Sequence, residues 1–303
     1  MRSYVSRSLN VYENLALEES LYKEAQNDIV LMFYRNTDSV VFGRHQNPFA
    51  EFLFPLPENC LPARRISGGG CVFHDAGNLN VSLIMDKTGF SKNILQEALI
   101  QALGEFSLPL SPGEKGDLFF AGKKVSGSAY AFSKNRAMHH ASLLLQSNLE
   151  KLITLLQSNC GNISGNRVNS RPSKVINLFP DRDISVIVPE IIQAVIKKMA
   201  DIICGECTGL DYIHPLHAVQ SQDVKAVSSW NRLFGKTPDF TYTHRSADKT
   251  LVLSVKKGRI ASCKKEDGSP VSALVDKGFD EYLCQELQVQ KKTTTLKGGV
   301  YDI

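Results

Sequence analysis

The residues most able to do chemistry begin with a glycine run beside two arginines. Arg64 and Arg65 precede Ser67-Gly68-Gly69-Gly70, and no Gly-Lys-Ser/Thr follows as it would in a Walker loop. Each glycine costs conformational entropy that another residue would spare. A run of free backbone N–H groups beside guanidinium groups suits a bound carboxylate or phosphate. The run therefore predicts an anion-binding loop, although a plain surface turn would give the same pattern.

A lysine beside small residues is the second candidate. Lys124 follows a tight turn and precedes the run from Val125 to Ala129, whose small side chains leave space over a sheet face. Strand alternation predicts that Lys124 points with Ser126 and Ser128, on the face opposite Gly127. A lysine there could reach a ligand. The alternative is a solvated surface lysine, which is what most lysines are.

Two histidine pairs give weaker signals. His139 and His140 are adjacent on an expected strand, so they face opposite ways and cannot both enter one pocket or hold one metal ion. At least one of them is expected to be structural. His74-Asp75 resembles half of a hydrolase triad, but no serine in a nucleophile elbow accompanies it. Hydrolysis is therefore a minor hypothesis.

The seven cysteines are scattered, and their odd number argues against a closed disulfide framework. A reducing compartment fits this pattern best. Cys204 and Cys207 have CxxC spacing, but no second pair or suitably spaced histidine completes a zinc site. Buried small hydrophobic residues are the preferred interpretation of this pair.

Hydrophobic periodicity predicts the elements that position these groups. Helical spacing is expected for residues 14–25, 94–106, 149–156, 191–203 and 279–287. In the first of these helices Leu15, Leu21 and Tyr22 would form the apolar face, with Glu18 and Glu19 elsewhere. Strands are expected at 30–34, 39–42, 71–74, 79–85, 117–120, 125–132, 138–146 and on both sides of Lys257-Gly258-Arg259. The segment 43–62 is expected to be a loop, because it contains four prolines.

Strands joined mostly by short turns, with helices between them, predict an α+β fold with a mixed β-sheet flanked by helices. We expect a catalytic domain over residues 1–245 and a second, small α+β domain over residues 246–303. The stretch from Ser158 to Ser173 is rich in Asn, Ser and Gly, so it should be a mobile loop.

Bulk composition is typical of a soluble globular protein. Of 303 residues, 43% are hydrophobic and 22% charged, which excludes a disordered or fibrous chain. The net charge of +4 is too slight to indicate nucleic-acid binding, but it suits an anionic ligand. Because the sequence shows no signal peptide and no membrane-spanning stretch, we expect a cytoplasmic protein, or a mitochondrial matrix protein if a transit peptide has been removed.

Several motifs together resemble the lipoate-protein ligases and lipoyltransferases. The segment Arg64 to Asn78, RRISGGGCVFHDAGN, is close to the signature of that family. Further family-like segments occur in the same order, and the resemblance covers about the first 245 residues. These segments are NLALEE at 14–19, GRHQNP at 43–48, Asp117-Leu118, KVSGSA at 124–129, His139-His140, VINL at 175–178 and the stretch 230–238.

The resemblance implies the fold of biotin and lipoate protein ligases and a reaction in two steps. Lipoate attacks the α-phosphate of ATP to give lipoyl-AMP, and a lysine of a carrier domain then takes the lipoyl group. ATP and Mg²⁺ would be required. The carriers would be the lipoyl domains of 2-oxoacid dehydrogenase E2 subunits and the glycine cleavage H protein, with no nucleic-acid or membrane partner. The enzyme is expected to be a monomer.

The resemblance also implies roles for single residues. Lys124 would be the catalytic cation at the junction of acyl group and phosphate. Asp117 would lie near Mg²⁺. The residues expected to bind lipoate or lipoyl-AMP are Arg65, Ser67, Gly68, Gly69, Gly70, His74 and His140. Those expected to contact the nucleotide are Val72, Phe73, Asn78, Arg171 and Val175. The loop from Ser158 to Ser173 would cover the adenylate.

Three alternatives stay open. The part from residue 246 onward is short, and in this family the small domain is linked to activation, so the chain could be a lipoyltransferase that uses preformed lipoyl-AMP. It could be an ATP-independent octanoyl or lipoyl transferase with Cys160 as nucleophile, although no basic partner for Cys160 is evident. It could also be an inactive lipoate-binding protein. Tyr34, Ile66 and Cys71 depart from residues common in the family motif.

Overall fold

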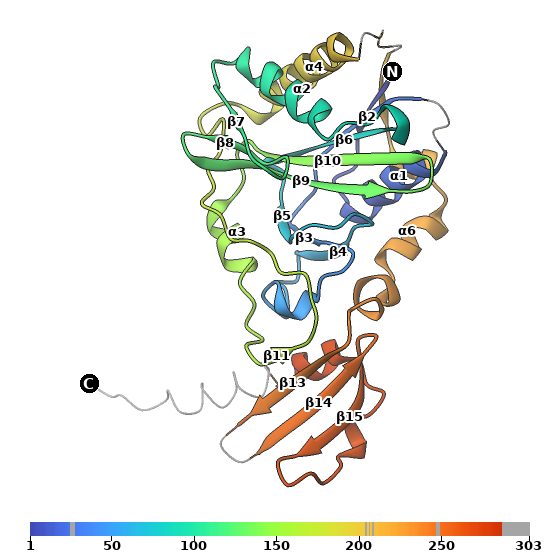
Figure 1. The fold of residues 1–303 in the computed structure, drawn as a ribbon, viewed down its shortest axis with the longest axis vertical. Helices are drawn as coiled ribbons and strands as arrows, with labels where there is room; N and C mark the ends of the chain where they lie inside the picture. Colours follow the sequence, from blue (N-terminus) through green and yellow to red (C-terminus); the bar gives the residue numbers. More distant parts are fainter. Residues whose placement is uncertain (25–27, 204, 206, 208, 247–248, 287–303) are drawn as a thin grey trace, which may run out of the picture.

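Eight strands form a mixed sheet at the centre of the molecule, in the order β12-β1-β2-β6-β10-β9-β8-β7 (Figure 1). The computed structural model describes residues 1–24, 28–203, 205, 207, 209–246 and 249–286. Strands β12, β1 and β2 run parallel, and the other neighbours pair antiparallel. The strands are β1 Arg2–Ser6, β2 Val30–Tyr34, β6 Asn78–Asp86, β7 Ser111–Pro112, β8 Leu118–Phe120, β9 Lys123–Phe132, β10 Arg136–Leu144 and β12 Leu210–Ile213.

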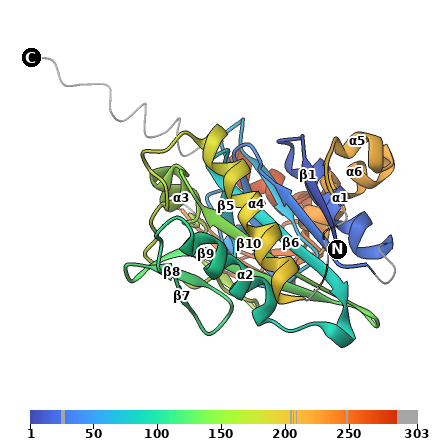
Figure 2. The ribbon, with the colours of Figure 1, turned by 90° about the horizontal axis from the view of Figure 1, so that it is seen from above.

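Two helices cover one face of this sheet. Helices α2 (Asn93–Gly104) and α4 (Ile184–Ile202) lie over β6, β9 and β10 (Figure 2), and their apolar sides close the main core. Helix α4 begins at Ile184 and not at Ile191, because the Asp183 side chain caps it by accepting the Ser185 N–H. Its apolar stripe then continues past Pro189, so the proline does not end the helix.

The opposite side carries helix α1 (Val11–Glu24), which packs with α5 (Pro215–Ala218) and α6 (Ser221–Ser228) against β2 and a three-stranded sheet. That sheet has the order β4-β3-β5, with β3 Ser39–Phe42, β4 Leu61–Arg64 and β5 Val72–His74. The glycine run connects β4 to β5. This topology places the predicted anion-binding loop under strands β9 and β10 of the large sheet.

A four-stranded antiparallel sheet lies at the lower end of Figure 1, in the order β11-β13-β14-β15. Its strands are β11 Ile163–Ser164, β13 Phe240–Arg245, β14 Thr250–Lys256 and β15 Arg259–Lys265. The short 3-10 helix η4 (Ser272–Leu274) and the helical residues 279–286 complete this part. Since β13 precedes residue 246 and β11 comes from the loop 158–173, this sheet draws on residues before the expected boundary. The division of the chain at residue 246 stays a proposal.

The small sheet shares its core with the rest of the chain. Phe49 is fully buried and contacts Phe234, Phe240 and Phe279, with ring centroids 5.6, 6.1 and 4.9 Å away. Phe49 belongs to the 3-10 helix η1 (Pro48–Ala50). Most of the segment 43–62 is loop, as expected, but Pro48 opens a short capped 3-10 turn and residues 61–62 already belong to β4.

The α+β class and the mixed sheet with flanking helices are confirmed. Strands β2 and β3 have the expected bounds, and α3 (Leu149–Leu155) and the β14–β15 hairpin are close to the expected ones. Strands β1 and β12 and helices α5 and α6 were not predicted. Short additional turns are η2 Lys87–Gly89 and η3 Asn231–Gly235. Ala25, Cys204 and residues 287–303, on which some predictions fall, lie outside the described residues.

No helix among the described residues is both long and apolar enough to span a bilayer.

Candidate active site

A cavity of about 240 Å³ lies between the glycine loop, strands β9 and β10, and the loop 158–173. The sequence-predicted residues that line it are Arg65, Gly69, Gly70, Val72, His74, Asp117, Lys124, His140 and Arg171. The fold therefore brings together residues that are more than 100 positions apart in the chain. Ser67, Gly68, Phe73, Asn78 and Val175 do not line this cavity.

Lys124 lies near the start of β9, where a second chain segment joins it. Its N–H donates to the Lys174 carbonyl at 2.8 Å, and its carbonyl accepts from the Ile176 N–H at 3.2 Å. These two bonds pair Lys124 with Val175 in a parallel bridge. The end of the loop 158–173 is thereby fixed beside the lysine. The Lys124 Nζ lies 3.0 Å from Asp117 Oδ1, with both side chains about a quarter exposed.

The expected grouping of the β9 side chains is wrong. The pairing of β8 with β9 shifts between Leu118–Ser126 and Phe119–Lys124, so a bulge with Val125 as the extra residue interrupts the alternation. The side chain of Lys124 consequently turns over Gly127. A Cβ built at Gly127 would lie 3.6 Å from Lys124 Cε and 3.7 Å from its Nζ. The lysine side chain therefore lies directly over Gly127.

Asp117 offers a single carboxylate to a metal ion. Within the described part of the chain, no three His, Cys, Asp or Glu side chains gather in a metal-binding group. Mg²⁺ is often held by one or two carboxylates together with substrate phosphates and water. The cavity therefore fits a Mg²⁺ ion that arrives with a nucleotide, and it does not fit a resident protein-bound metal.

Arg65 is a brace of the glycine loop. Its Nη2 donates at 2.6 Å to the carbonyls of both Gly68 and Gly70, and its Nε donates to Ser67 Oγ at 3.0 Å. Burial lowers the pKa of Arg65 to about 10, so the guanidinium stays charged at neutral pH. Gly69 has a φ of +84°, and a Cβ there would lie 2.9 Å from Arg65 Nη2. The loop wraps around this side chain, and that requires glycine.

Arg64 does not contribute a cation to the cavity, contrary to the expectation for the arginine pair. Its side chain is 1% exposed and lies over the ring of Phe42. It donates mainly to backbone carbonyls, among them those of Gln46 and Leu233 at 2.9 and 2.8 Å. Burial, followed by the charge of Arg232, lowers its pKa to about 9. Arg64 is therefore a structural residue. Its hydrogen bonds connect the turn that follows β3 with the helical turn η3.

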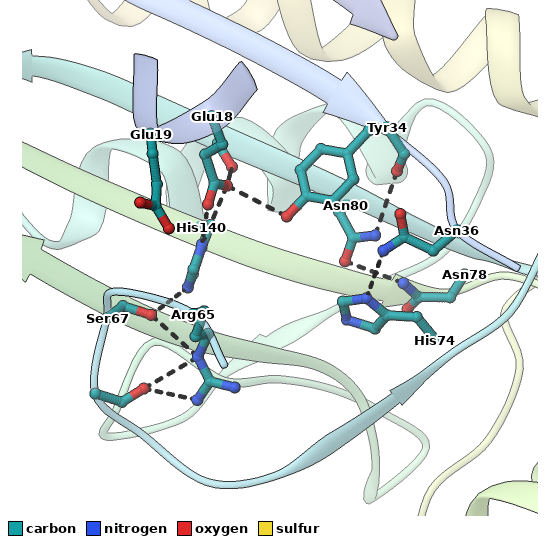
Figure 3. Close-up of polar contacts among 12 residues, drawn as sticks. Glu18, Glu19, Tyr34, Asn36, Arg65, Ser67, His74, Asn78, Asn80 and His140 are labelled. Atoms are coloured by element: carbon teal, nitrogen blue, oxygen red, sulfur yellow. Dashed lines mark hydrogen bonds and ion pairs between the residues drawn. The ribbon is translucent and has the colours of Figure 1, made fainter. Parts of the chain in front are cut away.

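Figure 3 shows a chain of polar contacts behind the glycine loop. Ser67 Oγ lies 2.6 Å from His140 Nε2, and His140 Nδ1 lies 3.2 Å from a carboxylate oxygen of Glu18. Glu18 is fully buried and also accepts the hydroxyl protons of Tyr34 and Ser82. Burial acts to raise the pKa of Glu18, but His140 and these hydrogen bonds together hold it below the usual value.

Glu18 and Glu19 contradict the expected polar face of the first helix, since both are buried. Glu18 points to His140, whereas Glu19 pairs with Arg232. Sequence offered one signal for Glu18, which stands three and four residues from Leu15 and Tyr22 and so shares their helix face. A carboxylate on an apolar stripe requires buried partners.

His74, like His140, lines the first cavity, and the Asn36 side-chain nitrogen lies 3.0 Å from its Nδ1. Burial, with Arg65 and His140 adding to it, lowers the pKa of His74 to about 3. His74 is therefore neutral at physiological pH. Asn78 is fully buried and donates to Asn80, while its Oδ1 has no hydrogen-bond partner among the residues that the structure describes. It lies beneath the surface that Asn80 presents to the cavity.

A second cavity of about 390 Å³ adjoins the first. Phe73, Leu144, Leu152, Leu156 and Val175 give it apolar walls. The residues that line both cavities are Cys71, Val72, Lys124, Gly127, Ser142, Ser170 and Arg171. The two hollows therefore meet at Lys124. Helix α3 supplies Leu152, and Leu156 follows directly after its last residue; the sequence did not indicate either as a site residue.

The loop 158–173 closes over both cavities through Ser170. The Ser170 hydroxyl donates to the carboxylate of Glu51 and accepts from the Cys71 N–H at 2.7 Å and from Gln46 Nε2 at 3.1 Å. Burial raises the pKa of Glu51, although the bonds from Ser170 act in the opposite direction. Neither Ser170 nor Glu51 was predicted, because their relation depends on two loops that are far apart in sequence.

Cys160 is poorly placed for a nucleophile. It is buried in the apolar cluster below the three-stranded sheet, and it lines neither cavity. Burial raises the pKa of its thiol to about 12. A thiol in such surroundings is almost wholly protonated at neutral pH and inert. The six cysteines that the structure describes are all free thiols.

The sequence profile of the lipoyl protein ligase A/B catalytic domain matches residues 10–200. The chain is 33% identical over 278 residues to the mitochondrial lipoyl amidotransferase LIPT1 of Mus musculus, a match that covers 85% of this chain and 74% of that protein.

Two solved structures share the fold. LipL1 of P. falciparum in complex with lipoate superposes with a TM-score of 0.63 at 21% identity, and the match covers 86% of this chain and 83% of that one. A lipoate-protein ligase A bound with ATP superposes at 0.58 and 24% identity, over 75% and 93% of the two chains. The profile match and the mouse relative show that this chain belongs to the family of lipoate-protein ligases and lipoyltransferases.

Proposed function

We propose that this protein joins lipoate to ATP to form lipoyl-AMP and then transfers the lipoyl group to a lysine of a carrier domain. The observation that carries this proposal is the meeting of two cavities at Lys124. An acyl-adenylate has two different halves joined at one acyl-phosphate bond. A site with two lobes and a cation at their junction suits such a molecule.

The two lobes suit different halves of the intermediate. We assign the lipoyl group to the first cavity, because it ends among Leu15, Tyr34 and His140 at the edge of the core. We assign the adenosine to the second, because Phe73 and Leu152 give apolar walls for a base and Arg171 lies beside the junction. This assignment agrees with the expected roles of Val72, Phe73, Arg171 and Val175.

Lys124 would act electrostatically on the reacting atoms. Its Nζ lies over Gly127 in the space shared by both lobes, so it can approach the carboxylate oxygen and the α-phosphate together. A fixed cation stabilises the negative charge that develops there in both steps. Asp117 orients the ammonium group at 3.0 Å. Mg²⁺ bound with ATP would neutralise charge on the phosphates.

A transferase that takes preformed lipoyl-AMP is the second candidate, and the mouse relative favours it because that protein is named an amidotransferase. The same two lobes would hold the same adenylate. The difference lies only in whether ATP and lipoate are accepted as substrates.

The deciding experiment measures pyrophosphate released from ATP with and without lipoate, next to transfer to a lipoyl domain from synthetic lipoyl-AMP. Lipoate-dependent release supports the ligase. Transfer from lipoyl-AMP without any release supports the transferase. An enzyme that does neither, while it still binds lipoate, would be the inactive binding protein. Lys124→Ala serves as the control for background hydrolysis.

We propose lipoyl domains of 2-oxoacid dehydrogenase E2 subunits and the glycine cleavage H protein as acceptors, and a monomeric enzyme. The free thiols suit a reducing compartment. That compartment is the cytoplasm or, as for the mouse relative, the mitochondrion.

A further inference from the structure

Glu18 lies behind the site and lines neither cavity, yet it is the charged end of a chain of buried polar groups that reaches the glycine loop (Figure 3). The chain runs from Glu18 to His140, then to Ser67, then to Arg65. Arg65 in turn holds the carbonyls of Gly68 and Gly70.

A count of donors and acceptors shows which atoms carry the protons in this series of hydrogen bonds. The Glu18 carboxylate can only accept, and its partners are the hydroxyls of Tyr34 and Ser82 and the Nδ1 of His140. His140 Nδ1 must therefore carry a proton. Ser67 Oγ accepts from Arg65 Nε, so its own proton is available to donate to His140 Nε2, which lies 2.6 Å away.

The shape of the glycine loop depends on Arg65, the last residue in this series of hydrogen bonds. Gly68 and Gly70 direct their carbonyls at Arg65, which turns the other side of the loop toward the cavity. Ser67 Oγ and the Gly68 carbonyl both accept from Arg65 Nε, at 3.0 and 3.1 Å, and so orient the guanidinium. A change in the ring orientation or tautomer of His140 would release Ser67, and with it one of the contacts that fix Arg65.

We propose that Glu18 is a positioning residue that holds His140 with its proton on Nδ1, so that His140 Nε2 accepts from Ser67 and the glycine loop keeps its shape. The inference rests on the proposed function, which assigns the ligand to that loop. Glu18 touches no substrate. It acts through three side chains, all of them at least nine-tenths buried.

The test compares Glu18→Gln with Glu19→Gln. Both changes put a neutral isostere at a buried position of α1, but Glu19 pairs with Arg232 and not with His140. Long-range proton–nitrogen NMR of the imidazole rings, assigned with His140→Gln, reports the tautomer. Hydrogen exchange of residues 67–71 reports the loop. We expect a single Nδ1–H tautomer in the wild type and in Glu19→Gln.

In Glu18→Gln we expect mixed tautomers at His140, loop exchange about 10-fold faster or more, and a KM for lipoate raised by a similar factor. A Glu18→Gln protein with the wild-type tautomer and wild-type loop exchange overturns the proposal. If Glu18→Gln does not fold, Ser67→Ala breaks the same chain, and unchanged loop exchange in that variant also overturns it. An enzyme inactive with both lipoate plus ATP and lipoyl-AMP would instead refute the proposed function, while the NMR and exchange results still decide the positioning role.

Discussion

Charged side chains of this protein divide into those that face a ligand and those that hold the site in shape. Lys124 and Asp117 are partly exposed in the cavity lining. Arg64, Arg65 and Glu18 are buried, and every contact described for them is with another part of the protein. The same residue types thus serve two purposes. Burial and hydrogen-bond partners, not residue type, decide which purpose applies.

Replacement of Lys124 by Ala should abolish lipoyl transfer and leave the fold intact. The site would lose a preorganised cation worth about 3 kcal/mol in the transition state, or roughly 100-fold or more in rate. The side chain is 24% exposed, so its loss leaves no core cavity. Transfer to a lipoyl domain and a thermal unfolding curve test both points. Lys123→Ala, a change at the exposed neighbour, is the matched control. Near-normal turnover of Lys124→Ala contradicts the assignment.

Replacement of Cys160 by Ser should leave activity with lipoate and ATP unchanged within about twofold. The adenylate route carries the acyl group on AMP, and the pKa of this buried thiol is raised to about 12, so it supplies almost no thiolate at neutral pH. Intact-mass measurement after incubation with acyl donor is the check. A hydroxylamine-sensitive adduct on the wild type that is absent from Cys160→Ser would establish the thioester route instead.

At the scale of elements, the loop 158–173 is tied to three parts of the molecule. Strand β11 within the loop pairs with β13 of the small sheet. The Ser170 hydroxyl accepts from the N–H of Cys71, at the end of the glycine loop. Val175, just after the loop, pairs with Lys124. The loop therefore spans the distance between the small sheet and the reacting atoms.

Amides of residues 158–173 should exchange more slowly when lipoyl-AMP is bound. Val168 to Arg171 line the first cavity, so a bound adenylate would add contacts to this part of the loop. Hydrogen exchange followed by mass spectrometry, with and without lipoyl-AMP, measures the effect. AMP alone serves as the control for occupancy of the nucleotide lobe. Equal exchange in both states removes the loop from the mechanism.

Ser170→Ala should loosen the same loop in the free protein. The change removes the hydroxyl that joins Glu51, Gln46 and the Cys71 N–H, and a buried group left without its partner costs about 1–3 kcal/mol. Exchange of residues 168–171 and of Cys71 should rise by about 10-fold or more. Ser164→Ala, at an exposed serine of the same loop, should not change it. If the two variants behave alike, Ser170 does not hold the loop.

At the scale of the whole molecule, the folded protein buries two neutral histidines. These side chains take up protons when the protein unfolds in acid. Burial, with the neighbouring His140 as a second cause, lowers the pKa of His139 to about 3, and His74 has a similar value. Both rings would titrate near 6.5 in the unfolded chain. Between these values the unfolded state binds more protons, so stability is complete above about pH 6.5 and falls as the pH is lowered toward 3.

Each of these histidines should contribute a slope of up to about 1.4 kcal/mol per pH unit to the free energy of unfolding. His139→Gln should remove one such contribution, since His139 lies outside the cavities and its ring contacts Ser128 and Tyr130. Urea unfolding at pH 7 and pH 5.5 measures the slope in both proteins. Burial raises the pKa values of Glu19 and Glu51, so these two carboxyl groups contribute a slope of the opposite sign. Their contribution is the same in the wild type and in His139→Gln, so it cancels when the two slopes are compared. Identical slopes would contradict the assignment.

Local signals in the sequence determined much of this protein. Continuous apolar runs on both sides of a polar turn predicted strands β2 and β3, and the glycine run with its arginines predicted an anion-binding loop. The motif resemblance gave the family, which the profile match and the mouse relative bear out. These features depend on neighbours in the chain, and short-range patterns therefore carry them. They also named Lys124, which the fold places between two cavities.

Only the tertiary structure decided which partners each side chain meets. The bulge at Val125 turned Lys124 toward Gly127, because pairing with β8 overrides simple alternation. Glu18 became a buried partner of His140, more than 100 residues away in sequence. Strands β1 and β12 were missed because they pair with each other although most of the chain lies between them in sequence. Burial, long-range pairing and shared hydrogen bonds arise only when distant segments meet, and no local pattern specifies them.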